Sequence, residues 1–383
     1  MIIRRVITFL LLFTILLTSF SGVIYAQPND TQMNFDCRSA ILIEAKTGKV
    51  LFEQNADEAL PPASVTKVMT LLLVMEAIEA GKISLSDMVS ASAHACSMGG
   101  SQIYLEEGEQ MSVEDLLKSV VIASANDAAV ALAEYLAGTE EAFVELMNKR
   151  AAELGMKNTN FDNTNGLDDT VENHVTSARD IAIMSSKLIS YPKITEYSSI
   201  WMDSIRNGEF GLTNTNRLVR FYKGANGLKT GSTSKAKFCI SASAERDGMT
   251  LIAVIMGAPT RDIRNAAATS LLDYGFANFG IYNSPKMDID DMRVLGGVKD
   301  FCKLITEDFN SVVKKTEVRN IRSIVELPQS ISAPVTIGDK VGSVKYYLGD
   351  TLIGSAEIVA EETVEVLGFW NLFIKFLANV SLL

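Results

Sequence analysis

The chain has 383 residues, a net charge of −11 and only two histidines. Its length allows two or three domains with a substantial core. The acidic balance argues against a nucleic-acid surface, and two histidines leave little material for a histidine-based triad or a zinc site. We therefore expect no metal, no other cofactor and no nucleic-acid partner.

The N-terminal residues 1–26 have the pattern of an export signal. Two arginines, Arg4 and Arg5, precede an apolar run from Val6 to Phe20. Cleavage is expected after Ala26, although Ile24 is bulkier than usual at the third position before the cut. The apolar length also allows an uncleaved N-terminal anchor. Either alternative predicts an exported protein that works at the outer face of the cytoplasmic membrane or in the cell wall.

Four widely spaced cysteines form no Cys-x-x-Cys pair; they are Cys37, Cys96, Cys239 and Cys302. Export makes a disulfide possible, but a chain of this length does not need one, and the sequence cannot pair them. We expect free, mostly buried thiols.

An antiparallel hairpin is predicted after a polar connector at 27–36. Two apolar runs, 39–44 and 49–53, flank a turn that contains a glycine. Pro61 and Pro62 then end the extended segment and lead into a helix.

This helix is expected to end at Gly81, and it has no polar stripe between Val68 and Met75, which predicts burial on most sides. Ser64 and Lys67 lie at its start, three residues apart, so their side chains share one face. A hydroxyl at this end of the helix also lies in the positive part of the helix dipole. Such a pair can be a nucleophile and its base.

Ser-x-x-Lys alone is a weak pattern. It recurs at Ser190/Lys193, Ser232/Lys235, Ser234/Lys237 and Ser311/Lys314. Taken by itself, Ser64 is better explained as a helix cap and Lys67 as a solvated lysine of the first turn.

Helices are expected to fill the middle of the chain, after an irregular polar segment at 82–108. Capping boxes at Ser112 and Ser177 open two of them, and the apolar residues that follow Ser112 recur with helical spacing. The expected helices run over 112–122, 128–137, 140–154 and 177–190. The segment 157–175 is rich in Asn, Asp, Thr and Gly, which predicts a long ordered loop or lid.

A strand is expected to begin at Lys229. A second hairpin is predicted from two apolar runs, 238–244 and 250–256, and a helix over 264–279 comes after it. Strands at both ends with helices between them indicate an α+β domain over 37–280, in which helices flank an antiparallel sheet.

A small β-sandwich-like domain is expected over 285–362, where short β-like runs alternate with turns. The tail, 363–383, has helical periodicity with one polar face. Lys375 in its middle would be costly in a spanning helix, so the tail is expected to lie in the membrane interface as an amphipathic anchor. The alternative is a helix docked on the β domain.

Three motifs stand in order along the chain: Ser64-x-x-Lys67, Ser124-Ala125-Asn126 and Lys229-Thr230-Gly231. Each is weak alone, but together they resemble the serine penicillin-recognising enzymes. The closest resemblance is to the low-molecular-mass penicillin-binding proteins that are serine D-alanyl-D-alanine carboxypeptidases. It covers essentially the whole chain and implies their transpeptidase-like fold.

The resemblance implies a role for each catalytic residue. Ser64 Oγ attacks the carbonyl between two D-alanines to give an acyl-enzyme, and Lys67 is the base if it is neutral. Burial and a second cation, Lys229, would both favour the neutral amine. Ser124 relays a proton toward the leaving amine. Asn126 holds Lys67 or the substrate amide.

The resemblance also implies the substrate-binding residues. Lys229 and Thr230 bind the terminal carboxylate, and the backbone N–H groups of Ser64 and Ser232 form the oxyanion hole. Gly231 lets the substrate backbone approach the strand edge. Many family members carry a bulkier residue than Ser232, so the mouth of this site is expected to differ.

Ordinary structural roles compete with three of these assignments. Ser124 is also explained as an N-cap between helices, Asn126 as a cap of the next helix and Lys229 as an exposed lysine. The second Lys-Thr-Gly, Lys46-Thr47-Gly48, has the composition of a hairpin turn and is given no catalytic role. No catalytic role is assigned either to two histidines and an aspartate: His94, His174, which is interpreted as a loop residue, and Asp180, which is interpreted as a helix cap.

The expected partners are peptidoglycan stem peptides and, as covalent inhibitors, β-lactams. A β-lactamase on the same frame is an alternative, but no Glu is placed with an Asn in the lactamase manner, because Glu145 and Asn148 fall in a helix. Ala125, where the related lactamase pattern has Asp, also favours the carboxypeptidase. A non-catalytic cell-wall binding protein and a transpeptidase are the remaining alternatives.

Overall fold

The computed structural model describes residues 33–169, 171–370 and 373. The export signal expected at 1–26 lies outside these residues, as do 371–372 and 374–383 of the expected anchoring helix. The described start of that segment is not helical as predicted, because Val364 pairs with Val335 and Val366 pairs with Gly297 in isolated β-bridges. The chain divides into two compact units, Met1–Phe35 and Asp36–Leu383. Every helix and strand that the structure describes belongs to the second unit.

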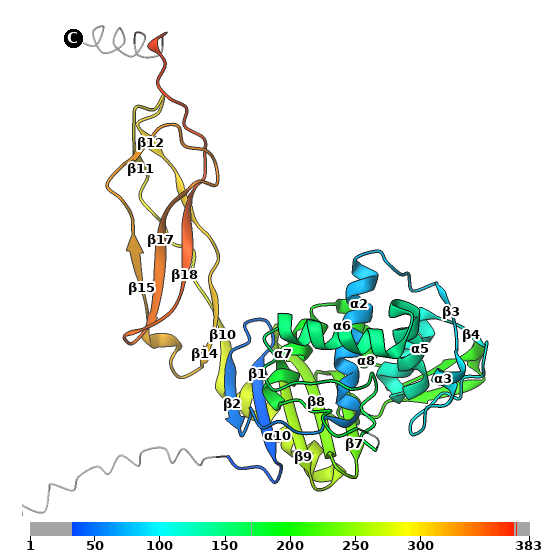
Figure 1. Ribbon diagram of the computed structural model, residues 1–383. Helices are drawn as coiled ribbons and strands as arrows, with labels where there is room; N and C mark the ends of the chain where they lie inside the picture. Colours follow the sequence, from blue (N-terminus) through cyan, green and yellow to red (C-terminus); the bar gives the residue numbers. More distant parts are fainter. Residues whose placement is uncertain (1–32, 170, 371–372, 374–383) are drawn as a thin grey trace, which may run out of the picture. The chain divides into compact units, whose positions relative to one another are not determined.

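A five-stranded antiparallel sheet forms the centre of the predicted α+β domain, in the order β2-β1-β9-β8-β7 (Figure 1). The strands are β1 (Ser39–Glu44), β2 (Val50–Gln54), β7 (Ala225–Thr233), β8 (Lys237–Arg246) and β9 (Met249–Ala258). Both predicted hairpins, β1-β2 and β8-β9, are confirmed. The order places β7 at one edge of the sheet, beside the first turn of the buried helix.

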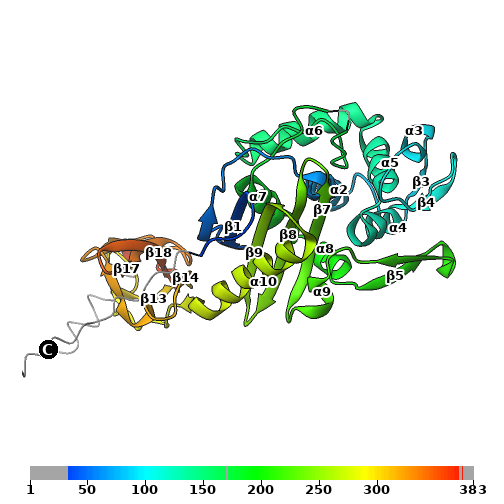
Figure 2. The same ribbon diagram turned by 90° about the horizontal axis from the view of Figure 1, so that it is seen from below.

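Helices cover both faces of this sheet. Helix α10 (Arg261–Asn278) lies on one face, and α2 (Lys67–Glu79) and α7 (Ala178–Ile189) lie on the other (Figure 2). A Cβ on Gly275 of α10 would lie 2.9 Å from Leu42 Cδ2, so the contact with β1 is close. Because β1 is buried on both faces, its sequence is a continuous apolar run instead of an alternating one.

The predicted helices of the middle region are confirmed. They are α4 (Val113–Lys118), α5 (Asn126–Ala137) and α6 (Glu140–Glu153), together with α2 and α7. Ser112 Oγ accepts a hydrogen bond from Asp115 N at 3.1 Å, and Ser177 Oγ accepts one from Asp180 N at the same distance. Ser112 and Ser177 therefore cap their helices as expected. The carboxylate of Asp180, interpreted from the sequence as a helix cap, instead accepts hydrogen bonds from Asn158 N and Thr159 Oγ.

Several short elements were not predicted. They are β3 (Met88–Ser90) with β4 (Gln110–Ser112), α3 (Ala93–Cys96), α8 (Pro192–Ser198), β5 (Met202–Ile205) with β6 (Phe210–Thr213), and α9 (Leu218–Phe221). The segment 82–108, expected to be irregular, thus contains a strand and a helical turn. Elements of three to seven residues are too short to show a period.

The C-terminal part is all β, as predicted. One sheet has the order β12-β11-β16 and the other β13-β18-β17-β15. Buried residues such as Met292 and Cys302 from the first sheet pack with Val344 and Ala360 from the second. The strands are β11 (Met292–Leu295), β12 (Phe301–Cys302), β13 (Leu304–Thr306), β15 (Ile321–Glu326), β16 (Ile331–Ser332), β17 (Lys340–Leu348) and β18 (Thr351–Ala360).

A further pair, β10 (Phe279–Asn283) with β14 (Asn310–Lys314), begins directly after α10. The domain boundaries at 280 and 285 stay predictions.

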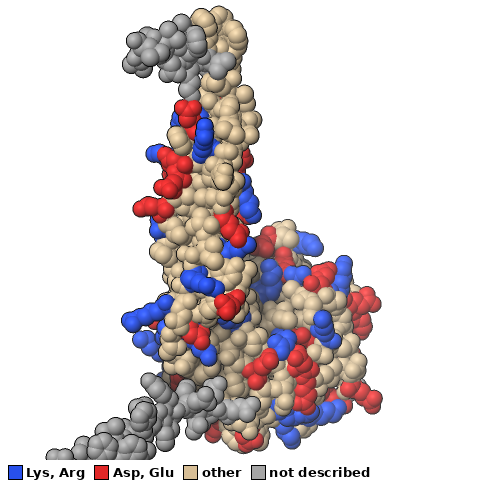
Figure 3. All heavy atoms as spheres, turned by 90° about the vertical axis from the view of Figure 1, so that its left-hand side faces the viewer, with Lys and Arg blue, Asp and Glu red and all other residues tan. Residues whose placement is uncertain are grey.

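The surface mixes charges of both signs. On the face shown in Figure 3, lysines and arginines alternate with aspartates and glutamates. The four cysteines are free thiols, as expected, although only Cys239 and Cys302 are fully buried. Within the part of the chain that is described, no helix combines the length and the apolar character needed to cross a bilayer.

Candidate active site

Ser64 lies in a single 3-10 turn, Ala63–Thr66, that leads into α2. Pro61 and Pro62 prevent the helix from extending further toward the N-terminus, and Lys67 is the first residue of α2. Lys67 Nζ lies 3.0 Å from Ser64 Oγ. The predicted pairing of the two side chains is therefore present, with Ser64 in the turn ahead of the helix.

Lys67 is completely buried and is held by two carbonyl oxygens. Its Nζ donates hydrogen bonds to Asn126 Oδ1 at 2.5 Å and to Asn165 O at 2.8 Å. Burial lowers the pKa of Lys67 well below its ordinary value, and the nearby charge of Lys229 lowers that pKa further. Asp127 acts on the pKa in the opposite direction and with the smallest effect of the three.

Ser124 lies where a π-helical turn, Ser119–Ala123, meets α5, and its backbone is left-handed with φ 64° and ψ 29°. Such turns are frequent at functional sites. Its explanation as an N-cap is wrong, because Ala125 holds that position. Asn126 does not cap α5 with its side chain either: its Nδ2 donates to Gly99 O at 2.6 Å, while its Oδ1 faces Lys67.

Lys229 lies in the middle of β7, not at its start, and is 1% exposed. Its explanation as an exposed lysine is therefore wrong. The ammonium donates to Thr230 O at 3.0 Å. Burial and the neighbouring Arg264 lower the pKa of Lys229 to about 7.

Gly231 brings β7 against the turn that carries Ser64. A Cβ at this position would lie 2.8 Å from Ser64 N and 2.9 Å from Pro62 O. Only glycine fits such a contact between two backbones. The resemblance implies that this glycine lets a substrate backbone approach the strand edge. The close contact in the structure is instead between β7 and the protein's own turn at Ser64.

One cleft of about 610 Å³ brings the three motifs together. Ser64, Ser124, Thr230, Gly231 and Ser232 all line it. Sequence reasoning missed the rest of its lining, which includes Trp201, Thr215, Arg217, Phe221, Arg261 and Arg264. Of these residues, Arg261 and Arg264 lie on α10 and Phe221 in α9, whereas the other three lie in the connections beside short elements, and no motif marks any of them. Arg264 is 3% exposed, and Thr230 Oγ donates to Thr215 Oγ at 2.8 Å.

Two family models match this chain. The one described as D-alanyl-D-alanine carboxypeptidase matches residues 26–260, and the one described as penicillin-binding protein 5, C-terminal domain, matches residues 288–366. The chain belongs to the D-alanyl-D-alanine carboxypeptidase family. It is thus a low-molecular-mass penicillin-binding protein, as the three motifs predicted.

Individual relatives agree with this assignment. The chain is 41% identical to the D-alanyl-D-alanine carboxypeptidase DacF of Bacillus subtilis (strain 168) over 369 residues, 94% of each protein. Penicillin-binding protein 5 from Haemophilus influenzae has 34% sequence identity and a TM-score of 0.75, over 87% of this chain and 98% of that one. Penicillin-binding protein D2 from Listeria monocytogenes, solved in its ampicillin-bound form, has 33% identity and a TM-score of 0.59, over 64% of this chain and 99% of that one.

The long loop of this carboxypeptidase, 157–175, contributes to the site from behind. Asn165 supplies the carbonyl that holds Lys67, and Thr164 O accepts a hydrogen bond from Thr70 Oγ of α2 at 2.6 Å. His174 is buried and bonded to Thr66, so its description as a plain loop residue is incomplete. The contact between Thr66 and His174 joins residues far apart in the sequence, so no local spacing predicts it.

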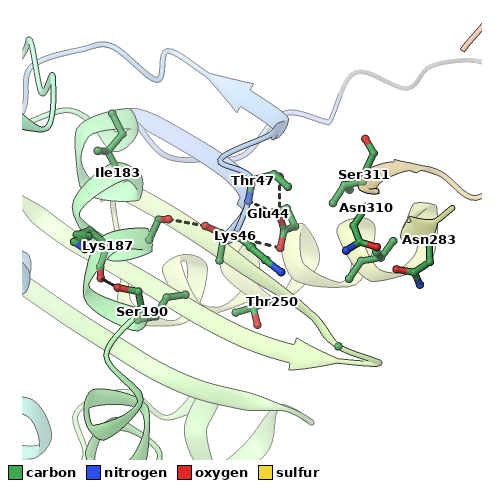
Figure 4. A pocket seen from close by; sticks show the side chains of 16 residues that line it. Glu44, Lys46, Thr47, Ile183, Lys187, Ser190, Thr250, Asn283, Asn310 and Ser311 are labelled. Carbon is green, nitrogen blue, oxygen red and sulfur yellow. Dashed lines mark hydrogen bonds between the residues drawn. The ribbon is translucent and has the colours of Figure 1, made fainter. Parts of the chain in front are cut away.

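The second Lys-Thr-Gly of this carboxypeptidase, Lys46-Thr47-Gly48, lies in the β1-β2 turn as expected. Glu44 accepts hydrogen bonds from the Lys46 and Thr47 backbone and from Thr47 Oγ. The turn borders a different pocket, of about 680 Å³, which α7, β10 and β14 also line (Figure 4). None of the three active-site motifs contributes to it.

Proposed function

We propose that this carboxypeptidase removes the terminal D-alanine from peptidoglycan stem pentapeptides through an acyl-enzyme on Ser64. The observation that carries the assignment is the contact of Lys67 Nζ with Ser64 Oγ at 3.0 Å in a fully buried setting. A buried amine with a lowered pKa is a competent base for a hydroxyl nucleophile.

The hydrogen bonds of Lys67 fit this role. A neutral amine has two hydrogens and one lone pair, and two carbonyl oxygens, Asn126 Oδ1 and Asn165 O, accept both hydrogens. The lone pair is then left for the hydroxyl hydrogen of Ser64. Asn126 therefore acts by orienting Lys67, which is one of the two roles expected for it.

The lining of the cleft supports the remaining roles. Ser124 faces the same cleft as Ser64 and would pass the proton to the leaving amine. Thr230 and Arg264 line the cleft, and Lys229 is the buried residue directly before Thr230. Lys229 and Thr230 would bind the terminal carboxylate, where Arg264 adds positive charge. The N–H groups of Ser64 and Ser232 would form the oxyanion hole, because β7 runs beside the Ser64 turn at Gly231.

β-lactams are expected to acylate Ser64 and to leave slowly. Slow release separates the carboxypeptidase from a β-lactamase on the same frame. Asn148, which the lactamase alternative would need in its catalytic loop, instead binds the backbone of Phe161 through both atoms of its amide, each at 2.8 Å. A non-catalytic binding protein would not need a buried amine beside Ser64.

Export and membrane attachment also belong to the proposal. Residues 1–26 would direct the chain across the membrane, and 363–383 would hold the enzyme at the outer face of that membrane, near its substrate. The amphipathic pattern of the tail supports this placement.

The test is intact-mass and peptide mapping of the purified protein after brief exposure to benzylpenicillin. We expect one adduct, on the peptide that contains Ser64, in wild type and in a Ser190→Ala control that alters another Ser-x-x-Lys pair. An adduct that persists in Ser64→Ala would refute the assignment. Rapid loss of the adduct with penicillin turnover would favour the β-lactamase.

A further inference from the structure

His174 occupies the end of the long loop and is 3% exposed. Its Nδ1 accepts a hydrogen bond from the backbone N–H of Asp162 at 2.9 Å, so the ring hydrogen must be on Nε2. Nε2 lies 2.7 Å from Thr66 Oγ and donates to it. Burial lowers the pKa of His174 to about 4, which keeps the ring neutral and this tautomer in place at pH 7.

Thr66 passes the hydrogen bond on to the peptide that precedes Ser64. Its Oγ donates to Ala63 O at 2.8 Å. Ala63 has a positive φ of 48°, a conformation that non-glycine residues rarely adopt, so the neighbouring contacts must hold it. Gly166 supplies one of them: a Cβ there would lie 1.9 Å from Ala63 O. The loop thus fixes the Ala63 carbonyl from behind the site.

The same peptide unit carries the N–H of Ser64. In a trans peptide the C=O and the N–H point in opposite directions. The Ala63 carbonyl points toward the Thr66 hydroxyl and toward Gly166 of the long loop. The Ser64 N–H points the other way, toward Gly231 of β7. A hydrogen bond accepted by the carbonyl polarises the unit and makes its N–H a stronger donor.

We propose that His174 is a positioning residue: through Thr66 it holds the Ala63–Ser64 peptide so that the Ser64 N–H points into the oxyanion hole, and it strengthens that donor. The inference rests on the proposed function, since an oxyanion forms there only if Ser64 is the nucleophile. It assigns a task in the reaction to a buried histidine that contacts neither Ser64 nor Lys67 directly.

Three variants separate the two bonds of His174. His174→Asn keeps an acceptor near the position of Nδ1 and removes the donor to Thr66. His174→Gln places an amide donor near the position of Nε2. Thr66→Val has nearly the same volume and removes the hydroxyl that links the ring to Ala63.

The readouts are the acylation rate constant with a fluorescent penicillin, the dissociation constant of the first complex and the ester carbonyl frequency of the acyl-enzyme. We expect His174→Asn and Thr66→Val each to slow acylation roughly tenfold, less than loss of a whole oxyanion donor. The dissociation constant should stay within threefold. The carbonyl frequency should rise, because the ester oxygen is held less strongly. His174→Gln should recover most of the rate, and the Asn/Val double variant should be no slower than Thr66→Val.

A merely structural role for His174 predicts a different result. It would lower the melting temperature and the fraction of active protein, while the active fraction kept the wild-type rate and carbonyl frequency. That result would overturn the inference, as would equal losses in His174→Gln and His174→Asn. If wild type reacts at Ser64 and the variants do not differ from it, only this inference fails; if wild type is not acylated, the proposed function fails as well.

Discussion

Two buried lysines give the site its chemistry, and their surroundings differ. Lys67 has no counter-ion among its hydrogen-bond partners, which are Ser64, Asn126 and the Asn165 carbonyl. Lys229 lies beside Arg264, which disfavours its charge until an anion arrives. The surroundings of each lysine lower its pKa and so favour the neutral amine, but only Lys67 lies where a neutral amine can take the proton of a hydroxyl. Lys229 needs the proton that a bound carboxylate would restore.

Replacing Lys67 tests its role as the base. We expect Lys67→Ala to slow acylation by fluorescent penicillin by about 10²–10⁴-fold, the usual contribution of a general base. The matched control is Lys193→Ala, which alters another Ser-x-x-Lys pair whose exposed lysine binds Glu196. Labelling of Lys67→Ala at the wild-type rate would contradict the assignment.

The pH dependence of kcat/KM tests Lys229. This parameter reports the free enzyme, in which the pKa of Lys229 is lowered to about 7. Above that pH the amine is neutral and no longer attracts a carboxylate, so kcat/KM for a D-Ala-D-Ala peptide should fall. Lys229→Arg keeps its charge and should shift this fall to higher pH. A descending limb at the same pH in both proteins would assign it to another group.

At the level of elements, the sequence predicted those helices and strands that have a periodic apolar pattern or a recognisable capping residue. The spacing of Val113, Leu116 and Val120 predicted a helix, and two capping boxes marked helix starts within a residue. Short elements such as β5 and α9 stayed hidden, and they carry Phe221 and flank Trp201 of the cleft. β7 was placed too late, because its first residues, Ala225-Asn226-Gly227, have the composition of a turn.

The sequence predicted the site residues that belong to the three motifs and missed most of the others. The sequence identified the members of the three motifs that the structure brings together: Ser64, Lys67, Ser124, Asn126 and Lys229-Thr230-Gly231. Arg264, Asn165 and His174 were not identified, because each meets the site through a contact between distant segments. Such contacts depend on the packing of α10 and of the long loop, which local spacing does not encode.

The fit between β7 and the Ser64 turn gives a prediction for Gly231. Gly231→Ala places a methyl group 2.8 Å from Ser64 N, so strand and turn must separate. Overpacking of this kind costs about 1–3 kcal/mol, or a fall in melting temperature of roughly 2–10 °C. Acylation should also slow, since the oxyanion hole opens.

Gly211→Ala is the matched control for Gly231→Ala. It also replaces a strand glycine, but a Cβ there meets nothing within 4 Å. Calorimetry and penicillin labelling should leave it close to wild type. Normal stability and labelling of Gly231→Ala would show that the contact at this glycine is not tight.

At the scale of the whole molecule, the catalytic and the C-terminal β parts each match a known family model, but the tail is known only by its pattern. Val366 pairs with Gly297 in an isolated antiparallel β-bridge, and Leu367 N donates a hydrogen bond to Gly296 O at 2.7 Å. A chain that ends at Leu367 therefore keeps these strand contacts. Removing 368–383 tests the tail alone.

We expect the shortened protein to leave the membrane fraction and to keep full labelling by penicillin, because the interface helix is gone while the site is intact. Fractionation followed by fluorescent labelling measures both properties. Continued tight association of the shortened and correctly processed protein with membranes would count against an anchor at 363–383.

The central claim is that Ser64, activated by Lys67, cleaves between two D-alanines. Its most direct test is the release of free D-alanine from a pentapeptide that ends in D-Ala-D-Ala. The account predicts release by wild type and by Ser190→Ala, and none above background by Ser64→Ala. Release by Ser64→Ala at the wild-type rate, or no release by a wild-type protein that is folded, would contradict it.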